Sequence, residues 1–173
     1  MILIQLTGLS GSGKTTISNA VQKILVKQGL QVEILDGDTI RKTKNKDLGF
    51  SKKDRHENIR RLGLMGYALT LENKVVIIAA INPYEEVRQE LAGKFGAKTV
   101  YIRCSIATLI KRDPKGLYSR ALLPENHPDK LRNLSGVNDV FEPPAAPDLI
   151  IDTEENSVEE SSSALAEFIL RSE

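Results

Sequence analysis

The stretch "MILIQLTGLSGSGKTT", residues 1–16, decides the fold of this chain. A short apolar run of β-forming residues leads into a glycine-rich loop, and helix-forming residues follow. Gly8, Gly13, Lys14 and Thr15 match the pattern G-x-x-x-x-G-K-[ST]. Glycines let the backbone curl so that successive N–H groups point inward, and the helix adds the positive end of its dipole. The stretch therefore predicts a phosphate-binding loop (P-loop) that holds a nucleoside triphosphate.

The P-loop residues have different expected roles in holding such a ligand. We expect Lys14 to reach the outer phosphates and the Thr15 hydroxyl to ligate Mg²⁺. Contacts to the triphosphate are expected from the whole loop, which adds Gly8, Leu9, Ser10, Gly11, Ser12, Gly13 and Thr16.

Outward from the P-loop, apolar runs of strand length alternate with stretches of helical periodicity. The expected strands are residues 1–7, 30–35, 74–81, 98–104 and 147–152, and the expected helices are residues 14–28, 52–71, 84–95 and 157–172. This alternation requires crossover connections, and therefore a parallel sheet covered on both faces. The run "KVVIIAAI" is apolar throughout, as is typical of a central parallel strand. We predict an α/β fold of the P-loop NTPase type: a doubly wound, mostly parallel five-stranded sheet with helices on both faces.

Helical periodicity also assigns the buried side of the last expected helix. Within residues 157–172, Val158, Leu165, Phe168 and Ile169 fall on one face. We expect this face to pack against the sheet.

Composition argues against several classes of partner. The 173 residues are 40% hydrophobic and 27% charged, with a formal net charge of +1, so no global field favours nucleic acid or a membrane surface. Aromatic residues make up 5% of the chain and tryptophan is absent, which argues against stacking on single-stranded nucleic acid. We expect one domain, residues 1–173, that binds small molecules.

Cysteine usage and hydropathy indicate the compartment. Cys104 is the single cysteine, which excludes an internal disulfide and is typical of a reducing compartment. No run approaches the ~20 apolar residues of a membrane span, and the opening apolar run is too short for a signal peptide. We expect a cytoplasmic protein without a membrane or nucleic-acid partner.

The segment from about residue 111 to 147 differs from the rest of the chain. It is rich in Pro, Asn and Asp and shows weak periodicity. A segment of this length inside a compact domain is usually functional, so we expect a flap over the site. Disorder is the alternative.

Two acids follow the second expected strand. The segment "ILDGDTIRK", residues 34–42, places Asp36 and Asp38 around a glycine, and one interpretation is a helix start with Asp as N-cap. The chain has no N-K-x-D guanine motif, and "KVVIIAAINPY" ends in Asn82 rather than in the acid that a motor ATPase needs. Asp36 and Asp38 are therefore the acids nearest the P-loop, at strand tips where α/β sheets bind ligands. This favours a small-molecule kinase.

The two acids have separate roles in such a kinase. One carboxylate takes the proton of the acceptor hydroxyl, and the other orients Mg²⁺ through its water. We favour Asp36 as the base and Asp38 on the metal side, and the exchanged assignment stays open.

A basic segment follows the acids. In "LGFSKKDRHENIRRLG", residues 48–63, Ser51 starts a capping box, and Arg55 and Asn58 then lie on one helical face. Arg41 comes from the preceding turn. Arginine suits phosphate or sulfate oxygens, an asparagine amide can read a base edge, and Phe50 can stack on a flat ring. A solvated basic helix is the alternative interpretation.

Six segments occur in an order that resembles the adenylyl-sulfate kinase family: "GLSGSGKTT", "LDGDTIR", "DLGFSKKDRHENIRR", "NPYEEVR", "RDPKGLYSRA" and "LSGVNDVFEPPAAPDL". The likeness runs from about residue 4 to 150. It implies that ATP, with Mg²⁺, donates its γ-phosphate to the 3′-hydroxyl of adenosine 5′-phosphosulfate (APS), giving 3′-phosphoadenosine 5′-phosphosulfate. It also implies a homodimer.

The resemblance also carries roles onto single residues. It implies that Arg41, Arg55 and Asn58 hold the acceptor nucleotide, that Phe50 and Phe141 flank its adenine, and that Ile81 and the adjacent Asn82 contact it. Lys115 in the flap would reach the phosphates, and Arg112 would bind ATP.

Within the matching segments, the chain departs from the family pattern at Asn82 and in one link. Asn82 stands in "NPY" where many members have a serine that can be phosphorylated, so we expect direct in-line transfer without a phosphoenzyme. The link "LLPENHPDKLRNLSG" replaces a shorter basic one over the acceptor pocket. Two alternatives therefore stay open: a related kinase of another nucleotide, such as a cytidine diphosphate derivative, and a non-catalytic regulatory subunit. The two acids and the arginines argue against the latter.

Overall fold

The computed structural model describes residues 1–172 and contains one parallel five-stranded sheet. The strands are β1 (Leu3–Thr7), β2 (Val32–Asp36), β3 (Val75–Ala79), β4 (Lys98–Arg103) and β5 (Leu149–Asp152). The helices are α1 (Lys14–Lys27), α2 (Gly37–Thr43), α3 (Lys52–Thr70), α4 (Glu85–Phe95), α5 (Ile106–Arg112), α6 (Leu117–Ala121) and α7 (Val158–Arg171). The strand order is β2-β3-β1-β4-β5, and every pairing is parallel. The predicted fold class is confirmed.

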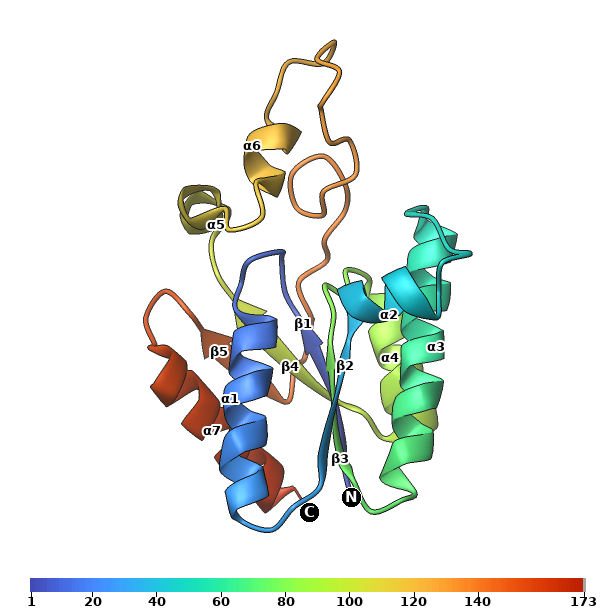
Figure 1. Ribbon diagram of the computed structural model, residues 1–173, viewed down its shortest axis with the longest axis vertical. Helices are drawn as coiled ribbons and strands as arrows, with labels where there is room; N and C mark the ends of the chain where they lie inside the picture. Colours follow the sequence, from blue (N-terminus) through green and yellow to red (C-terminus); the bar gives the residue numbers. More distant parts are fainter. Residues whose placement is uncertain (173) are drawn as a thin grey trace.

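Helices cover both faces of the sheet, as the strand–helix alternation requires (Figure 1). One apolar cluster joins the sheet to α1 and α7, and a second joins it to α3 and α4. All residues of the two central strands β1 and β3 are buried, which explains why their apolar runs do not alternate.

One prediction about packing is wrong. Val158 is 50% exposed, whereas Leu165 and Ile169 are buried and Phe168 packs against the core. Ser157 and Glu160 form a capping box that starts α7 beyond the core, and there Val158 lines a cavity beside the P-loop. The buried face of α7 instead begins with two serines, Ser161 and Ser162.

The flap is structured. The segment between β4 and β5 contains α5 and α6 and extends beyond the carboxyl ends of the strands (Figure 1). Leu9, Leu109, Tyr118 and Leu134 are buried together in a small third apolar cluster beneath it. The Tyr118 hydroxyl donates to the Ser10 carbonyl at 2.8 Å, which ties the flap to the P-loop.

Across residues 1–172, no helix combines the length and apolar character that crossing a membrane requires.

Candidate active site

Two cavities meet at the carboxyl-terminal edge of the sheet, where parallel strands bring their loops together. The first, which we call the P-loop cavity, has a volume of about 180 Å³ and is lined by the P-loop, both acids and Lys115. The second, which we call the arginine cavity, has a volume of about 60 Å³ and is lined by Arg41 and Arg55 among others. Asp38, Ala80 and Ile81 line both cavities and so form their boundary.

The P-loop has the tight backbone that its glycines predict. Gly8 has φ +154°, and a Cβ at this position would lie 2.4 Å from the Ile102 carbonyl oxygen. Only glycine fits such an approach. The loop therefore passes directly over β4 before turning into α1.

Lys14 is buried at the base of the P-loop. Its Nζ donates to the carbonyls of Gly8 at 2.8 Å and Leu9 at 2.7 Å. Burial lowers its pKa to about 7, with Lys115 adding to the effect and Asp38 and Asp36 opposing it. A bound triphosphate would supply the negative charge that favours the protonated amine.

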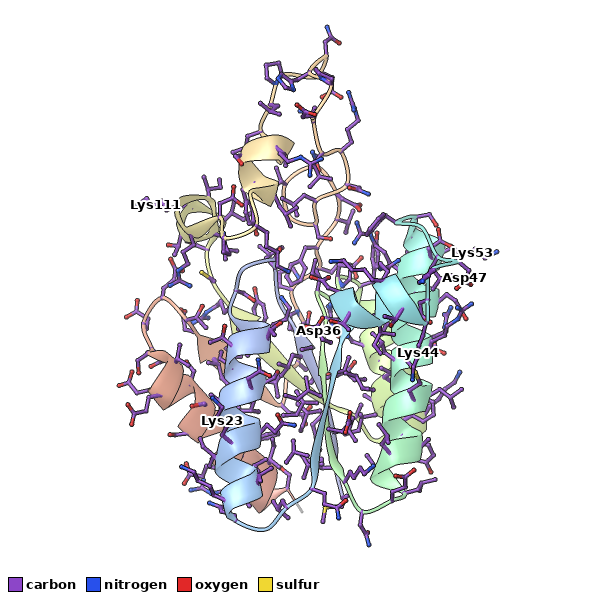
Figure 2. The ribbon with its side chains drawn as sticks, in the orientation of Figure 1. Lys23, Asp36, Lys44, Asp47, Lys53 and Lys111 are labelled. Carbon is purple, nitrogen blue, oxygen red and sulfur yellow. The ribbon has the colours of Figure 1, made fainter. Side chains whose placement is uncertain are left out.

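Asp36 sits at the junction of β2 and α2, next to the P-loop (Figure 2). One carboxylate oxygen accepts from the Thr39 amide at 2.9 Å, which makes Asp36 the N-cap of α2, and the other accepts from the Thr15 hydroxyl at 3.1 Å. Burial opposes ionisation, but these hydrogen bonds outweigh it and keep the pKa of Asp36 below its ordinary value. Both interpretations of this acid, helix cap and site residue, are therefore compatible.

The residues around Thr15 fit Mg²⁺ in the form that P-loop proteins use. Thr15 and Asp36 present hard oxygen atoms within 3.1 Å of each other. Within residues 1–172 there is no group of three or more His, Cys, Asp or Glu side chains that could form a complete metal cage. Mg²⁺ commonly takes one or two protein oxygens and completes its shell with water and phosphate.

Asp38 and Lys115 meet across the P-loop cavity. Lys115 comes from the turn between α5 and α6, and its Nζ lies 2.6 Å from the Asp38 carboxylate. Both side chains are more than half exposed, at 54% and 65%, so this pair adds little to stability. It places one cation of the flap and one carboxylate of α2 at the boundary between the cavities.

The arginine cavity gathers most of the predicted acceptor residues. Arg41 and Arg55 lie over the Phe50 ring, 4.9 and 5.5 Å from its centroid. Asn58 is buried and accepts a hydrogen bond from the Asn45 amide at 2.9 Å, a neighbour that the sequence analysis missed. Ile81 and Asn82 line the same cavity. Helical spacing predicted that Arg55 and Asn58 share a face, and the family resemblance supplied the rest of the group.

One wall residue of the arginine cavity is bonded to the flap. Arg55 donates to the Asn133 carbonyl at 2.7 Å and pairs with Asp139 at 2.8 Å. A volume of about 60 Å³ is well below the roughly 300–1,000 Å³ of typical ligand pockets. A nucleotide therefore needs more space than this cavity offers in the structure described.

One aromatic residue, Phe141, and one basic residue, Arg61, lie outside this cavity. Phe141 does not line it; the ring is half-buried in the flap cluster, 6.2 Å from Tyr101. Arg61 faces solvent and pairs with Asp47 and Glu57. Figure 2 shows Asp47 with Lys53 at the outer end of α3. The solvated-face interpretation is therefore correct for Arg61 but not for Arg55.

A third cavity of about 300 Å³ opens on the other side of the P-loop. Arg112 lines it and donates to the Thr153 carbonyl at 2.7 Å, while the Thr153 hydroxyl donates to the Ser12 carbonyl at 3.1 Å. Ser157 lines it too. Thr153 and Ser157 were not predicted from the sequence.

The sequence and the fold are both similar to those of known adenylyl-sulfate kinases. The family model described as adenylylsulphate kinase matches residues 1–152. The adenylyl-sulfate kinase of Bacillus pumilus is 45% identical over 172 residues, covering 96% of this chain and 84% of that protein. That of Microcystis aeruginosa is 42% identical over 161 residues, covering 92% and 86%. The Mycobacterium tuberculosis APS kinase, solved in complex with AMPPNP and APS, superimposes with a TM-score of 0.89 at 30% identity and covers 98% and 97% of the two chains.

Proposed function

The chain belongs to the adenylyl-sulfate kinase family, and from this premise we propose the reaction of its active site. The protein is an ATP-dependent kinase that transfers the γ-phosphate of ATP to the 3′-hydroxyl of APS, giving 3′-phosphoadenosine 5′-phosphosulfate for sulfate assimilation. The structural observation that carries the proposal is the boundary residue Asp38, which lines a P-loop cavity on one side and an arginine cavity on the other.

The geometry favours exchanging the roles that the sequence analysis preferred for the two acids. Asp36 lines the P-loop cavity but not the arginine cavity, and its oxygens already bond to Thr15 and Thr39. Asp38 is more than half exposed at the boundary. A general base must come within hydrogen-bond reach of the hydroxyl that it deprotonates. We therefore assign the base to Asp38 and the metal side to Asp36.

The ATP side uses the P-loop and the third cavity. The loop residues 8–16 hold the triphosphate, and Lys14 contacts its outer phosphates. Arg112 and Thr153 border the space for the adenine ring of ATP. Thr15 and Asp36 would hold Mg²⁺, which supplies charge neutralisation on the phosphates. Transfer has a loose transition state, so positioning and charge neutralisation do most of the catalysis.

The acceptor side uses the arginine cavity. Arg41 and Arg55 hold the phosphosulfate of the acceptor. Asn58 contacts the adenine ring of the acceptor and Phe50 stacks on it. Ile81 and Asn82 form the floor of the cavity. Phe141 joins them once the flap rearranges around the bound nucleotide. Lys115 moves from Asp38 to the phosphates when ATP binds, which frees the Asp38 carboxylate to act as the general base. The position of Arg41, Arg55, Asn58 and their neighbours in one cavity supports this set, from which Phe141 and Lys115 lie apart.

Assembly and compartment are further parts of the proposal. We propose a homodimer as in the sequence analysis; the Thiobacillus denitrificans APS kinase, at a TM-score of 0.70 and 25% identity, is described as hexameric, so assembly occurs among similar proteins. We also propose the cytoplasm, which the buried free thiol of Cys104 supports.

A coupled assay of ADP release tests the acceptor. Purified protein receives ATP, Mg²⁺ and one acceptor at a time: APS, adenosine 5′-monophosphate, cytidine diphosphate or no acceptor. We expect turnover with APS far above the others, because the chain belongs to the adenylyl-sulfate kinase family. Preference for the cytidine nucleotide would reject the acceptor, and ATP binding without any turnover would reject catalysis.

A further inference from the structure

The motif "NPYEEVR" contains a charged residue that the reaction above does not use. Arg88, on α4, has a side-chain exposure of only 2%, and it lines neither the P-loop cavity nor the arginine cavity. A buried guanidinium is costly unless it is paired and fully hydrogen-bonded. What its hydrogen bonds hold together is therefore informative.

Arg88 uses four N–H···O contacts, and two of them go to backbone carbonyls outside its own helix. Nη1 donates to Asn82 O at 2.6 Å, and Nη2 donates to Glu142 O at 2.6 Å. Nε and Nη2 both bond to the Glu85 carboxylate, at 3.0 and 2.6 Å. Glu85 balances the charge, and the planar fork of the guanidinium fixes the directions of the carbonyl bonds. One side chain thus joins the turn after β3 to the end of the flap.

The turn after β3 is locked by a closed set of three side-chain bonds. Arg88 donates to Asn82 O, the Asn82 amide donates to Gln5 Oε1 at 3.1 Å, and Gln5 donates to Arg88 O at 2.9 Å. Gln5 also donates to Thr99 at 3.0 Å, which fixes the orientation of its amide. Asn82 has φ +47°, a conformation that non-glycine residues seldom adopt, so this set also holds an unfavourable backbone in place.

The same turn is bonded to the start of the P-loop. The Thr7 hydroxyl lies 3.0 Å from both Ile81 O and Asn82 O, and the Gly8 amide donates to Ile81 O at 3.2 Å. The floor of the arginine cavity and the entry to the P-loop are therefore one connected unit, with Arg88 behind it.

The end of the flap is held from two sides. Glu142 donates its amide to Pro83 O at 2.8 Å and accepts from the Glu85 amide at 2.7 Å, next to its carbonyl bond with Arg88. Three residues earlier, Asp139 pairs with Arg55. The segment 139–142, which carries Phe141, thus runs between two arginines.

We propose that Arg88 is the positioning residue of the acceptor side. It holds the floor at Ile81–Asn82 and the flap end at Glu142 in one arrangement relative to the P-loop, and so sets where the acceptor hydroxyl lies relative to the γ-phosphate. The identity of that acceptor rests on the proposed function.

The test compares Arg88→Lys with Arg60→Lys. Arg60 also pairs with an acid of α4, Glu90 at 2.7 Å, but it is 40% exposed and holds no flap carbonyl. We expect Arg88→Lys to raise the KM for APS about tenfold or more and to lower kcat, with the KM for ATP within about twofold of wild type. Arg60→Lys should change neither KM. Two results for Arg88→Lys would overturn the proposal: an equal rise of the KM for APS and the KM for ATP, or a lower melting temperature with both KM values unchanged.

Two further readouts separate positioning from bulk stability. Millimolar guanidinium chloride should restore part of the APS turnover of Arg88→Ala, by filling the vacated site, whereas sodium chloride should not. Amide exchange at Glu142 should be faster in Arg88→Lys than in Arg60→Lys; unchanged exchange would overturn the proposal. The exchange comparison needs no substrate, so it decides on Arg88 even if the wild type failed to phosphorylate APS, a result that would refute only the proposed function.

Discussion

Lys115 of the flap forms an ion pair with Asp38 of α2, with 2.6 Å between its Nζ and the carboxylate, although 77 residues separate the two in the chain. The pair lies at the boundary of the two cavities that our proposal assigns to donor and acceptor. We expect the lysine to leave this carboxylate for another anion when the donor binds. The triphosphate provides one, which would couple donor binding to release of the base.

The first prediction concerns this base. Asp38→Asn should lower kcat by about 10²–10⁴-fold, the usual size of general-base catalysis, and leave ATP affinity little changed. Asp36→Asn is the matched variant: asparagine also caps helices well, so α2 should remain intact, and the loss should appear in the Mg²⁺ dependence of the rate. Steady-state kinetics at varied Mg²⁺ distinguish the two. Full activity of Asp38→Asn would return the base to Asp36.

The second prediction concerns Lys115. Lys115→Gln should leave the melting temperature within error of wild type, because an exposed pair contributes about 0–1 kcal/mol. Its kcat should fall roughly 10²–10³-fold, the size of the loss when one donor to a developing charge is removed. Thermal unfolding and the ADP-release assay measure the two effects. Lys111→Gln, on the adjacent α5, is the control and should match the wild type in both.

The third prediction is a pH dependence of ATP binding. Because burial lowers the pKa of Lys14 to about 7, the free protein loses this charge as the pH rises through neutrality. Bound triphosphate raises the pKa again, so binding should take up nearly one proton at about pH 8 and almost none at about pH 6. Calorimetry in buffers of different ionisation enthalpy measures the uptake. Lys14→Arg stays charged and supplies the baseline; equal uptake by both proteins would contradict the prediction.

The fourth prediction separates Arg55 from the neighbouring Arg61. Arg55→Ala should cost about 1.5–3 kcal/mol of acceptor binding, or roughly ten- to a hundredfold in the KM for APS, because a buried charged hydrogen-bond donor is lost. Arg61→Ala removes a surface arginine of the same helix that lines neither cavity, and its KM should stay at the wild-type value. Equal effects of the two substitutions would place Arg55 outside the site.

The fifth prediction concerns a close contact between Gly37, the first residue of α2, and Ala80, the residue after β3. A Cβ on Gly37 would lie 2.8 Å from the Ala80 Cβ, so Gly37→Ala should destabilise the protein by about 1–3 kcal/mol through overpacking. Gly93, in α4, has no atom within 4 Å of such a Cβ, and Gly93→Ala should stabilise by about 0.4–1 kcal/mol. Urea unfolding measures both free energies. Opposite signs are expected, and equal signs would contradict the packing argument.

Local sequence determined the P-loop, the five strands and the shared helical face of Arg55 and Asn58. Each of these depends on interactions between residues close in the chain: glycine torsions, apolar periodicity and the i, i+3 spacing of a helix. The crossover rule then requires a parallel sheet, which brings the strand tips to one edge. For that reason the location of the site could be predicted before any distance was known.

Tertiary structure decided which acid lies between the cavities, that Lys115 meets Asp38, and that Phe141 lies in the flap cluster. It also decided that Arg88 joins the turn after β3 to the distant end of the flap, and that Val158 faces a cavity instead of the core. None of these has a periodic or local signature, because each depends on where a long connection returns over the sheet. These contacts depend on the packing of the whole molecule. Their partners lie 50 or more residues apart in the chain and come within hydrogen-bond distance only when the sheet brings them together.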